Sequence, residues 1–240
     1  MSSERKVAVI TGASRGIGAS LVEGFHKLGY GVVANSRTIG KAGLNPDAQT
    51  VLVEGDIADP ATSSRILSAA LERFGRVDTL VNNAGVFIPK PFVDYSEADF
   101  VAMINVNLAG FFHISQKVIP GMLRAGSGHI VNVTATIAEQ PTTSLPAALA
   151  SLTKVGLNGV TRALALEYAS RGIRVNAVSP GATRTSMHPP ETHGFLAGLQ
   201  PMGRMAETHE IRDAVLYLEK SAFVTGEILH VDGGASTGRW

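Results

Sequence analysis

A glycine-rich turn near the start of the chain carries the first residues whose types and spacing could do chemistry. The turn spans residues 11–18, contains Gly12, Gly16 and Gly18, and lies between the apolar stretch 7–10 and an amphipathic stretch. In the order strand, turn, helix, such glycines permit a tight bend and let the backbone approach a pyrophosphate, which the free N–H groups of the helix start then face. The pattern predicts a dinucleotide phosphate site, although such turns also serve as plain connections. The other candidate residues of the turn are Ser14, Arg15 and Ile17.

Composition restricts the class of protein. The chain has 240 residues, 45% of them hydrophobic, and a net charge of +1 at pH 7, which favours a globular core over disorder or a broad nucleic-acid surface. It has no cysteine, so disulfides and thiolate metal sites are excluded, and we expect no metal. No apolar run approaches the roughly 18 residues that span a bilayer, and the N-terminus lacks a signal-peptide core. We expect a cytoplasmic protein with no membrane or nucleic-acid partner.

Strand and helix patterns alternate along the chain. Apolar, β-branched stretches predict parallel strands at residues 6–11, 31–35, 50–54, 79–82, 129–134, 174–177 and 228–231. Helical patterns lie at residues 19–28, 63–74, 100–107, 108–124 and 147–171. Asp59-Pro60 and the pair Ser96/Asp99 are typical helix starts, whereas the glycines of residues 38–49 disfavour a full helix. We expect one doubly wound, Rossmann-type α/β domain over residues 1–240.

Several spaced motifs together resemble one family. Residues 11–18 fit the pattern T-G-x-x-x-G-x-G of the short-chain dehydrogenases/reductases. Further similar motifs follow in the same order, at residues 55–57 (GDI), 82–85 (NNAG), 106–110 (VNLAG), 130–132 (IVN), 180–181 (PG) and 225–234. The resemblance covers nearly the whole chain and implies a nicotinamide-dependent oxidoreductase acting on a small-molecule substrate.

The resemblance also implies roles for individual residues. Asp56 would accept a hydrogen bond from the adenine amino group, and Thr185 would hold the nicotinamide carboxamide. The run Asn83-Ala84-Gly85 would line the adenosine ribose and stiffen the central strand. Read without the family, that run is a strand-ending turn and Asp56 is a loop cap. The remaining cofactor candidates are Ile57, Pro180, Gly181 and Thr183.

The end of the second strand bears on the choice of nicotinamide cofactor. An acidic residue there would bind the ribose 2′-OH and favour NAD. This chain has Asn35, Ser36 and Arg37 at that place and no carboxylate. Ser36 and Arg37 suit a 2′-phosphate, and Arg15 of the glycine turn would face the same group. Surface arginines are often only solvated, but the combination favours NADPH or NADP+.

The catalytic centre departs from the family pattern. Carbonyl reduction needs a hydride and a proton for the developing alkoxide. The resemblance implies that a tyrosine four residues before a lysine donates that proton, with the ammonium lowering the pKa of the phenol. Lys154 matches the lysine, yet Ala150 stands four residues before it, and none of the four tyrosines is there. The chain therefore resembles a divergent member that lacks the catalytic tyrosine.

Two further catalytic positions follow from the resemblance. Asn107 matches the asparagine that would hold a water linked to the lysine. The serine position falls on Ala135 when counted from the preceding strand and on Ile137 when counted back from Lys154, so the loop is about two residues longer than in the family. Thr136 lies between them, and its hydroxyl is a candidate to replace the serine, the alternative being a β-branched strand residue.

A mobile substrate lid is expected at about residues 183–205. It contains His188 and His193, which titrate near neutrality and are candidates to protonate an alkoxide or enolate. Histidines in such a segment are also commonly solvated. His188 is the lid residue that we include in the catalytic set.

Three hypotheses remain open on the sequence alone. The chain is an NADPH-dependent reductase with a non-standard proton donor, acting on a carbonyl, imine, quinone or activated C=C bond. Alternatively, it is an inactive NADPH-binding sensor or the partner subunit of an active enzyme. In the third hypothesis, Ala150 is a substitution made to trap substrate. By analogy with the family, we expect a homotetramer or homodimer.

Overall fold

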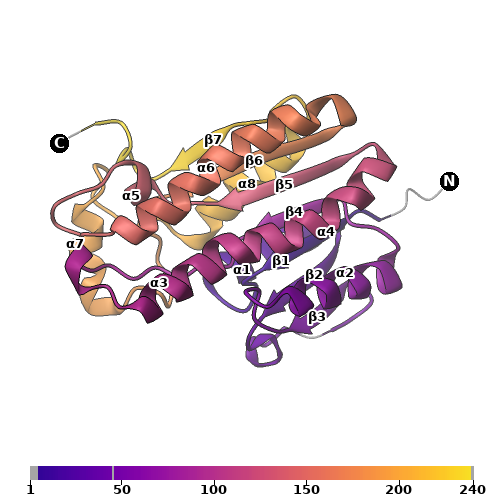
Figure 1. Ribbon diagram of the computed structural model, residues 1–240, viewed down its shortest axis with the longest axis horizontal. Helices are drawn as coiled ribbons and strands as arrows, with labels where there is room; N and C mark the ends of the chain where they lie inside the picture. The colour runs from indigo at the N-terminus through magenta and orange to yellow at the C-terminus, as the bar shows by residue number, and fades with distance from the viewer. Residues whose placement is uncertain (1–4, 45, 239–240) are drawn as a thin grey trace.

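A seven-stranded parallel sheet forms the centre of the molecule (Figure 1). The computed structural model describes residues 5–44 and 46–238. The spatial order is β3-β2-β1-β4-β5-β6-β7, which confirms the doubly wound α/β domain. All seven expected strands are present, and three have the expected bounds. The strands are β1 Val7–Thr11, β2 Gly31–Ser36, β3 Thr50–Glu54, β4 Thr79–Asn82, β5 Gly128–Val133, β6 Ile173–Pro180 and β7 Ile228–Val231.

Helices cover both faces of this sheet. On one face α1 (Gly16–Lys27) packs beside α8 (Thr208–Lys220), and their apolar residues join the strands in one core cluster. On the other face lie α2 (Pro60–Phe74), α4 (Gly110–Ala125) and α6 (Ala148–Tyr168), which are in front in Figure 1. Strands that are apolar on both sides are therefore buried on both sides, as parallel strands require.

The expected helix starts are confirmed where a cap directs them. Asp59 accepts a hydrogen bond from the N–H of Ala61 at 2.9 Å, with Pro60 in the first turn of α2. Ser96 and Asp99 form a capping box at the start of α3 (Glu97–Ile104). Helix α8, in contrast, was not expected, although its buried residues recur at helical spacing. The described part of residues 38–49 contains only the short turn η1 (Ile39–Lys41), as expected.

The two helices expected at residues 100–107 and 108–124 are in fact one continuous helical segment. A π-helical turn, η3 (Asn105–Ala109), joins α3 to α4, so the chain is helical over Glu97–Ala125. By length and composition alone this 29-residue segment could cross a membrane, although no single apolar run in the sequence predicts it. Its residues Ile114 and Met122 are fully buried against the sheet. The remaining short elements are η2 (Phe92–Asp94), α5 (Thr136–Glu139), η4 (Ala169–Arg171), η5 (Pro190–Thr192) and α7 (His193–Gly198).

A buried carboxylate holds the amino-terminal edge of the sheet together. Glu219, near the end of α8, accepts hydrogen bonds from Tyr30 at 2.7 Å, from Thr79 at 3.0 Å and from Nδ1 of His129 at 2.6 Å. The side-chain amide nitrogen of Asn176 lies 3.0 Å from Nε2 of His129, so both ring nitrogens have partners. Burial alone would raise the pKa of Glu219, but these three donors lower it to about 2.

Candidate active site

The glycine turn lies at the carboxyl edge of the sheet, where β1 ends and α1 begins. Gly12 and Gly16 have φ angles of +66° and +56°, which favour glycine. A Cβ on Gly18 would collide with the carbonyl oxygen of Gly12, so Gly18 lets helix and strand approach closely. The close approach and the left-handed backbone are the features that a pyrophosphate cradle needs, and the turn fits a dinucleotide.

The start of α1 leaves its N–H groups available. Arg15 occupies the N-cap position in extended conformation, and no side chain caps the helix, unlike the starts of α2 and α3. Uncapped N–H groups and the positive end of the helix dipole together suit a phosphate. The Arg15 side chain is exposed beside them. Ser14 and Ile17 are half-buried in the same turn.

Asn83 connects the glycine turn to the end of β4 through hydrogen bonds. Its side-chain amide donates to the carbonyl oxygens of Thr11 and Gly12 at 2.9 and 3.1 Å. The hydroxyl of Thr11 in turn accepts from the N–H groups of Asn83 and Ala84 at 3.1 and 3.0 Å. The Asn83 side chain therefore binds the backbone of the turn, so it acts on a cofactor by shaping the turn.

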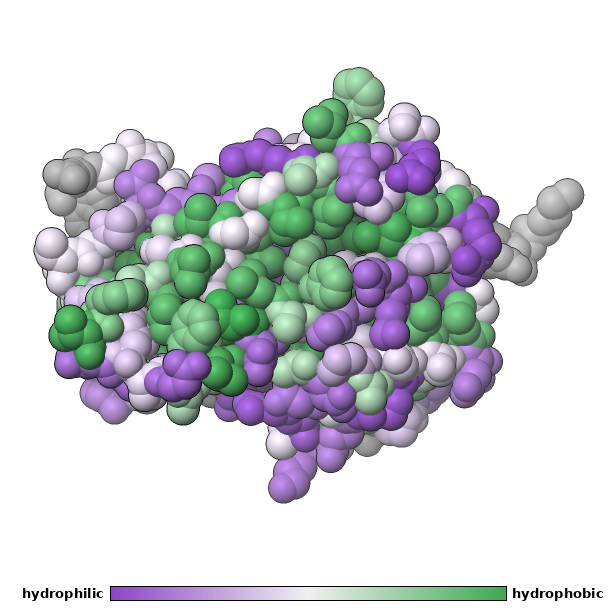
Figure 2. All heavy atoms as spheres, in the orientation of Figure 1, coloured by the Kyte–Doolittle hydropathy of each residue, from purple (hydrophilic) through white to green (hydrophobic). Residues whose placement is uncertain are grey.

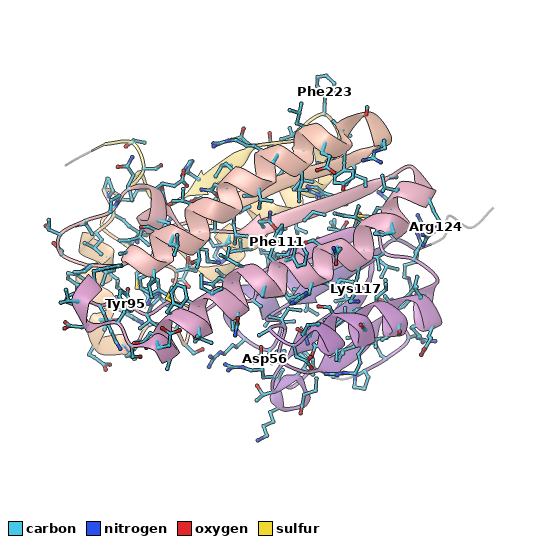
Figure 3. All side chains as sticks on the ribbon, in the orientation of Figure 1. Asp56, Tyr95, Phe111, Lys117, Arg124 and Phe223 are labelled. Carbon is cyan, nitrogen blue, oxygen red and sulfur yellow. The ribbon has the colours of Figure 1, made fainter. Side chains whose placement is uncertain are left out.

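The expected 2′-phosphate residues lie together at the end of β2. Asn35 is buried and donates to the carbonyl of Val53 at 2.9 Å, whereas Ser36 is half-buried and Arg37 exposed. Asp56, labelled in Figure 3, lies just after β3, and its Oδ1 accepts from the N–H of Ala58 at 3.0 Å. One Asp56 oxygen is thus committed to the loop and the other remains for a ligand.

Ile57 differs from its neighbour Asp56. It is 5% exposed, and its side chain packs against Gly110 at the start of α4. A Cβ on Gly110 would approach it to 2.9 Å. The Ile57 side chain is a core residue, and only its backbone is placed to line a cofactor.

The π-helical turn directs Asn107 into the site. Its Oδ1 accepts from the N–H of Val86 at 2.9 Å, and its Nδ2 donates to the carbonyl of Val86 at 3.0 Å and to the hydroxyl of Thr153 at 3.1 Å. Asn107 is only 2% exposed. A π-turn widens the helix by one residue, a feature often found at functional sites. Here it connects α3–α4, α6 and the segment after β4 through one amide.

Lys154 extends from α6 to the same place. Its Nζ donates to the carbonyl oxygen of Val133, at the end of β5, at 2.8 Å. A Cβ on Gly85 would lie 3.2 Å from this Nζ and 3.3 Å from Oδ1 of Asn107, so the three residues meet at one point. Burial lowers the pKa of Lys154 to about 8. The structure thus brings together the predicted residues Gly85, Asn107 and Lys154.

Sequence reasoning missed two contributors to this cluster. The hydroxyl of Thr153 positions Asn107, and the carbonyl of Val133 positions the ammonium of Lys154. Their neighbours in the sequence were recognised, but backbone carbonyls and a helical threonine carry no signal that names their partners.

Ala150 lies in an apolar cluster away from solvent. It is 1% exposed and packs with Met103 and Leu149. Tyr95, labelled in Figure 3 near α3, packs against this cluster, but its hydroxyl donates to the carbonyl of Ile88 at 2.7 Å. The other half-buried members of the cluster are Val86, Phe87, Ile88 and Ala147.

Thr136 is not brought to Lys154. It begins helix α5 instead of ending a strand, and its buried hydroxyl lies 3.1 Å from both the carbonyl of Ser179 and Oδ2 of Asp232. These contacts tie the helix to β6 and to the segment after β7.

The segment expected as a lid begins on the glycine turn. A Cβ on Gly16 would lie 3.1 Å from the Thr185 side chain, so the two cofactor candidates are adjacent. Thr183 is 4% exposed, and its hydroxyl donates to the carbonyl of Gly181, one residue after Pro180 at the end of β6.

His188 lies further along this segment. It is half-buried, and its carbonyl oxygen lies 3.0 Å from Nε2 of His193, whose Nδ1 lies 3.1 Å from Arg184. Burial, and then the neighbouring His193, lower the pKa of His188, which makes it neutral at pH 7. No hydrogen bond among the described residues connects its side chain to Lys154 or Asn107.

The chain is similar to known proteins over nearly its whole length. A family model described as enoyl-(acyl carrier protein) reductase matches residues 12–236. A 3-oxoacyl-[acyl-carrier-protein] reductase of Thermotoga maritima is 34% identical, covering 98% of this chain and 99% of that protein. A 3alpha-hydroxysteroid dehydrogenase of Mediterraneibacter gnavus is 35% identical, covering 98% of each.

Solved structures are similar over the same extent. ElxO with NADP bound has a TM-score of 0.90 at 28% identity, covering 98% of this chain and 100% of that one. The 3-ketoacyl-(acyl-carrier-protein) reductase of Brucella melitensis complexed with NADH has a TM-score of 0.88 at 33% identity, covering 97% and 99%. Both similar structures carry a nicotinamide cofactor.

Proposed function

Because this chain belongs to the short-chain dehydrogenase/reductase family, we propose that it is an NADPH-dependent reductase with a non-standard proton donor. The family makes it an oxidoreductase, and the similar solved structures make a nicotinamide its cofactor. The observation that carries the proposal is the meeting of Gly85, Asn107 and Lys154 beside the glycine turn. Catalytic groups and a cofactor cradle at one carboxyl edge are the arrangement that hydride transfer needs.

The proposed roles follow from the geometry. When bound, the reduced nicotinamide supplies a hydride to the substrate. The uncapped start of α1 would hold its phosphates, and Arg15, Ser36 and Arg37 would hold the 2′-phosphate of NADPH. The Lys154 ammonium would bind a ribose hydroxyl with one of the N–H groups that Val133 leaves free.

The substrate is proposed to be a small molecule with a carbonyl, imine, quinone or activated C=C group. Relatives named as a 3-oxoacyl-[acyl-carrier-protein] reductase and as a 3alpha-hydroxysteroid dehydrogenase support a carbonyl or alcohol as the reacting group. We propose that residues 183–205 close over it, because Met187, Phe195 and Met202 expose 52%, 47% and 64% of their surface there. Such residues would exclude water from a partly apolar ligand.

A second function is favoured by one observation. Ala150 stands where the family resemblance implies the proton-donating tyrosine, and it is buried among apolar side chains. An NADPH-binding sensor, or a partner subunit of an active enzyme, would need no donor there.

We further propose that a second copy of the chain covers the face of α4 and α6. Phe112, Leu152, Val155 and Leu166 are 52%, 55%, 44% and 86% exposed on these helices. Figure 2 shows hydrophobic residues gathered on this face, and Phe111, labelled in Figure 3, lines a small cavity together with Leu157 of α6. Exposed apolar faces of this kind mark interfaces. Light scattering should give a dimer or tetramer, and a monomer would refute this part.

NADPH oxidation tests the main proposal. The protein is assayed against ketones, diketones, quinones, enones and cyclic imines, with Lys154→Ala as the control. We expect turnover with at least one class and its loss in the variant. Binding of NADPH with no turnover of any class would favour the sensor or subunit.

A further inference from the structure

The hydroxyl groups around the cluster of Gly85, Asn107 and Lys154 have their protons committed. Thr11 and Thr153 each have a backbone carbonyl as acceptor, at 3.4 and 3.1 Å. Thr136, which lies away from the cluster, also has a carbonyl acceptor, at 3.1 Å. A hydroxyl has one proton, so none of these three has a second to give. Tyr95 also donates to a carbonyl, at 2.7 Å.

Lys154 is different because it has more donors than partners. An ammonium carries three N–H groups, and one of them is accounted for by the carbonyl of Val133 at 2.8 Å. The Lys154 side chain is half-buried. Gly85 lies beside its Nζ and, as a glycine, has no side chain to cover the ammonium. Ala150 itself carries no protic group, and the hydroxyl of Tyr95, which packs against the same cluster, donates to the carbonyl of Ile88. Lys154 is therefore the group at this point with a proton to transfer.

We propose that the ammonium of Lys154 donates the proton to the substrate oxygen directly. This inference rests on the proposed reductase function. The substrate carbon accepts the hydride, which forms a C–H bond and moves the C=O π pair onto oxygen. An Nζ–H bond of Lys154 breaks as the O–H bond forms, and the resulting neutral amine recovers a proton from water. The carbonyl of Val133 holds the amine in place through both states.

The surroundings of Lys154 favour transfer of its proton to the substrate oxygen. Burial lowers the pKa of Lys154 to about 8, and no charged side chain among the described residues contributes to the shift. A general acid is most effective when its pKa lies near the working pH. The group is protonated below about pH 8, so reduction should be lost as the pH rises through that value.

Two replacements at one position test the role. Lys154→Arg keeps the positive charge but does not release a proton at working pH. We expect it to bind NADPH within about threefold of wild type and to lose about 100-fold or more in kcat, the usual contribution of a general acid. Lys154→Cys can be alkylated with bromoethylamine at that position alone, because the chain has no other cysteine. The alkylated side chain carries an amine whose pKa is lower than that of lysine. Activity should therefore return, and the pH above which it is lost should be lower than in wild type.

The pKa of the Lys154 amine can also be measured without substrate turnover. Competitive acylation with acetic anhydride, followed by mass spectrometry, gives the pH at which each lysine becomes nucleophilic. Lys154 should react at lower pH than the exposed Lys41, once its lower accessibility is taken into account. An acylation profile parallel to that of Lys41 would overturn the assignment.

Other outcomes separate this inference from the function on which it rests. A wild-type protein that binds NADPH and reduces nothing refutes both. If wild type is active and Lys154→Arg retains kcat within about tenfold, only the donor assignment fails. Lys220→Arg, the same exchange at an exposed position at the end of α8, is the matched control and should keep kcat within about threefold. A loss in His188→Ala equal to that of Lys154→Arg would assign the proton to the lid instead.

Discussion

Replacing Glu219 with glutamine tests the account of the buried network at the amino-terminal edge of the sheet. The donors Tyr30, Thr79 and His129 hold the carboxylate ionised, and the pKa falls from 4.5 to about 2. A shift of about 2.5 units corresponds to about 3 kcal/mol of unfolding free energy at neutral pH. The loss should lower Tm by about 6–12 °C in a domain of this size.

The pH dependence gives the sign of this effect. The folded-state pKa is depressed, so the contribution of Glu219 is complete above about pH 4.5 and is lost as the pH falls toward about 2. At pH 3.5 the difference between wild type and Glu219→Gln should be about 1.4 kcal/mol smaller than at pH 7.

Urea unfolding followed by circular dichroism at both pH values measures this difference. Glu72→Gln, at an exposed position on α2, is the control and should change stability by less than about 0.5 kcal/mol. Because Glu219 lies at the edge opposite the glycine turn, the affinity for NADPH should not change. Equal stability of Glu219→Gln and wild type at pH 7, or a difference that is the same at pH 3.5, would refute the reasoning.

Three further changes probe the cofactor cradle and its supports. Arg37→Asp should weaken NADPH binding about tenfold or more by fluorescence titration while sparing NADH, and an unchanged preference would exclude the 2′-phosphate role. Gly18→Ala should cost about 1–3 kcal/mol of stability and weaken NADPH binding, because its Cβ would overlap a carbonyl of the turn, whereas Gly159→Ala has open space and should be tolerated. Asn107→Ala should lower stability by about 2–4 kcal/mol in thermal unfolding, since both backbone groups of Val86 lose their partner, and a neutral result would contradict the burial of that amide.

The strands were predictable from the sequence because burial on both faces leaves a clear apolar pattern. β3, β4 and β7 begin and end where the pattern does. Helix α8 was overlooked although Ile211 and Val215 recur at helical spacing. The π-turn at Asn105–Ala109 could not be read, because it depends on how Asn107 bonds across to the segment after β4.

The candidate site also contains residues that the sequence predicts and contacts that it does not. Gly18 and Lys154 were predictable because the turn needs glycine and the motif fixes the lysine by its spacing. The partners of Lys154 were not, since its Nζ binds a backbone carbonyl of a strand 21 residues away. Thr136 shows the reverse error, where a hydroxyl of the right type near the right place is turned toward Ser179 and Asp232.

The Glu219 carboxylate also constrains how the chain folds. Its three donors lie 189, 140 and 90 residues earlier in the sequence, in three different parts of the sheet. Until α8 docks, the hydroxyl groups of Tyr30 and Thr79 and the ring of His129 have no acceptor at this edge. Contacts of such separation close late and slow the final step of folding. A nascent chain that has not yet released residue 219 from the ribosome therefore holds an incomplete sheet edge, and the domain can close only after α8 is available to dock.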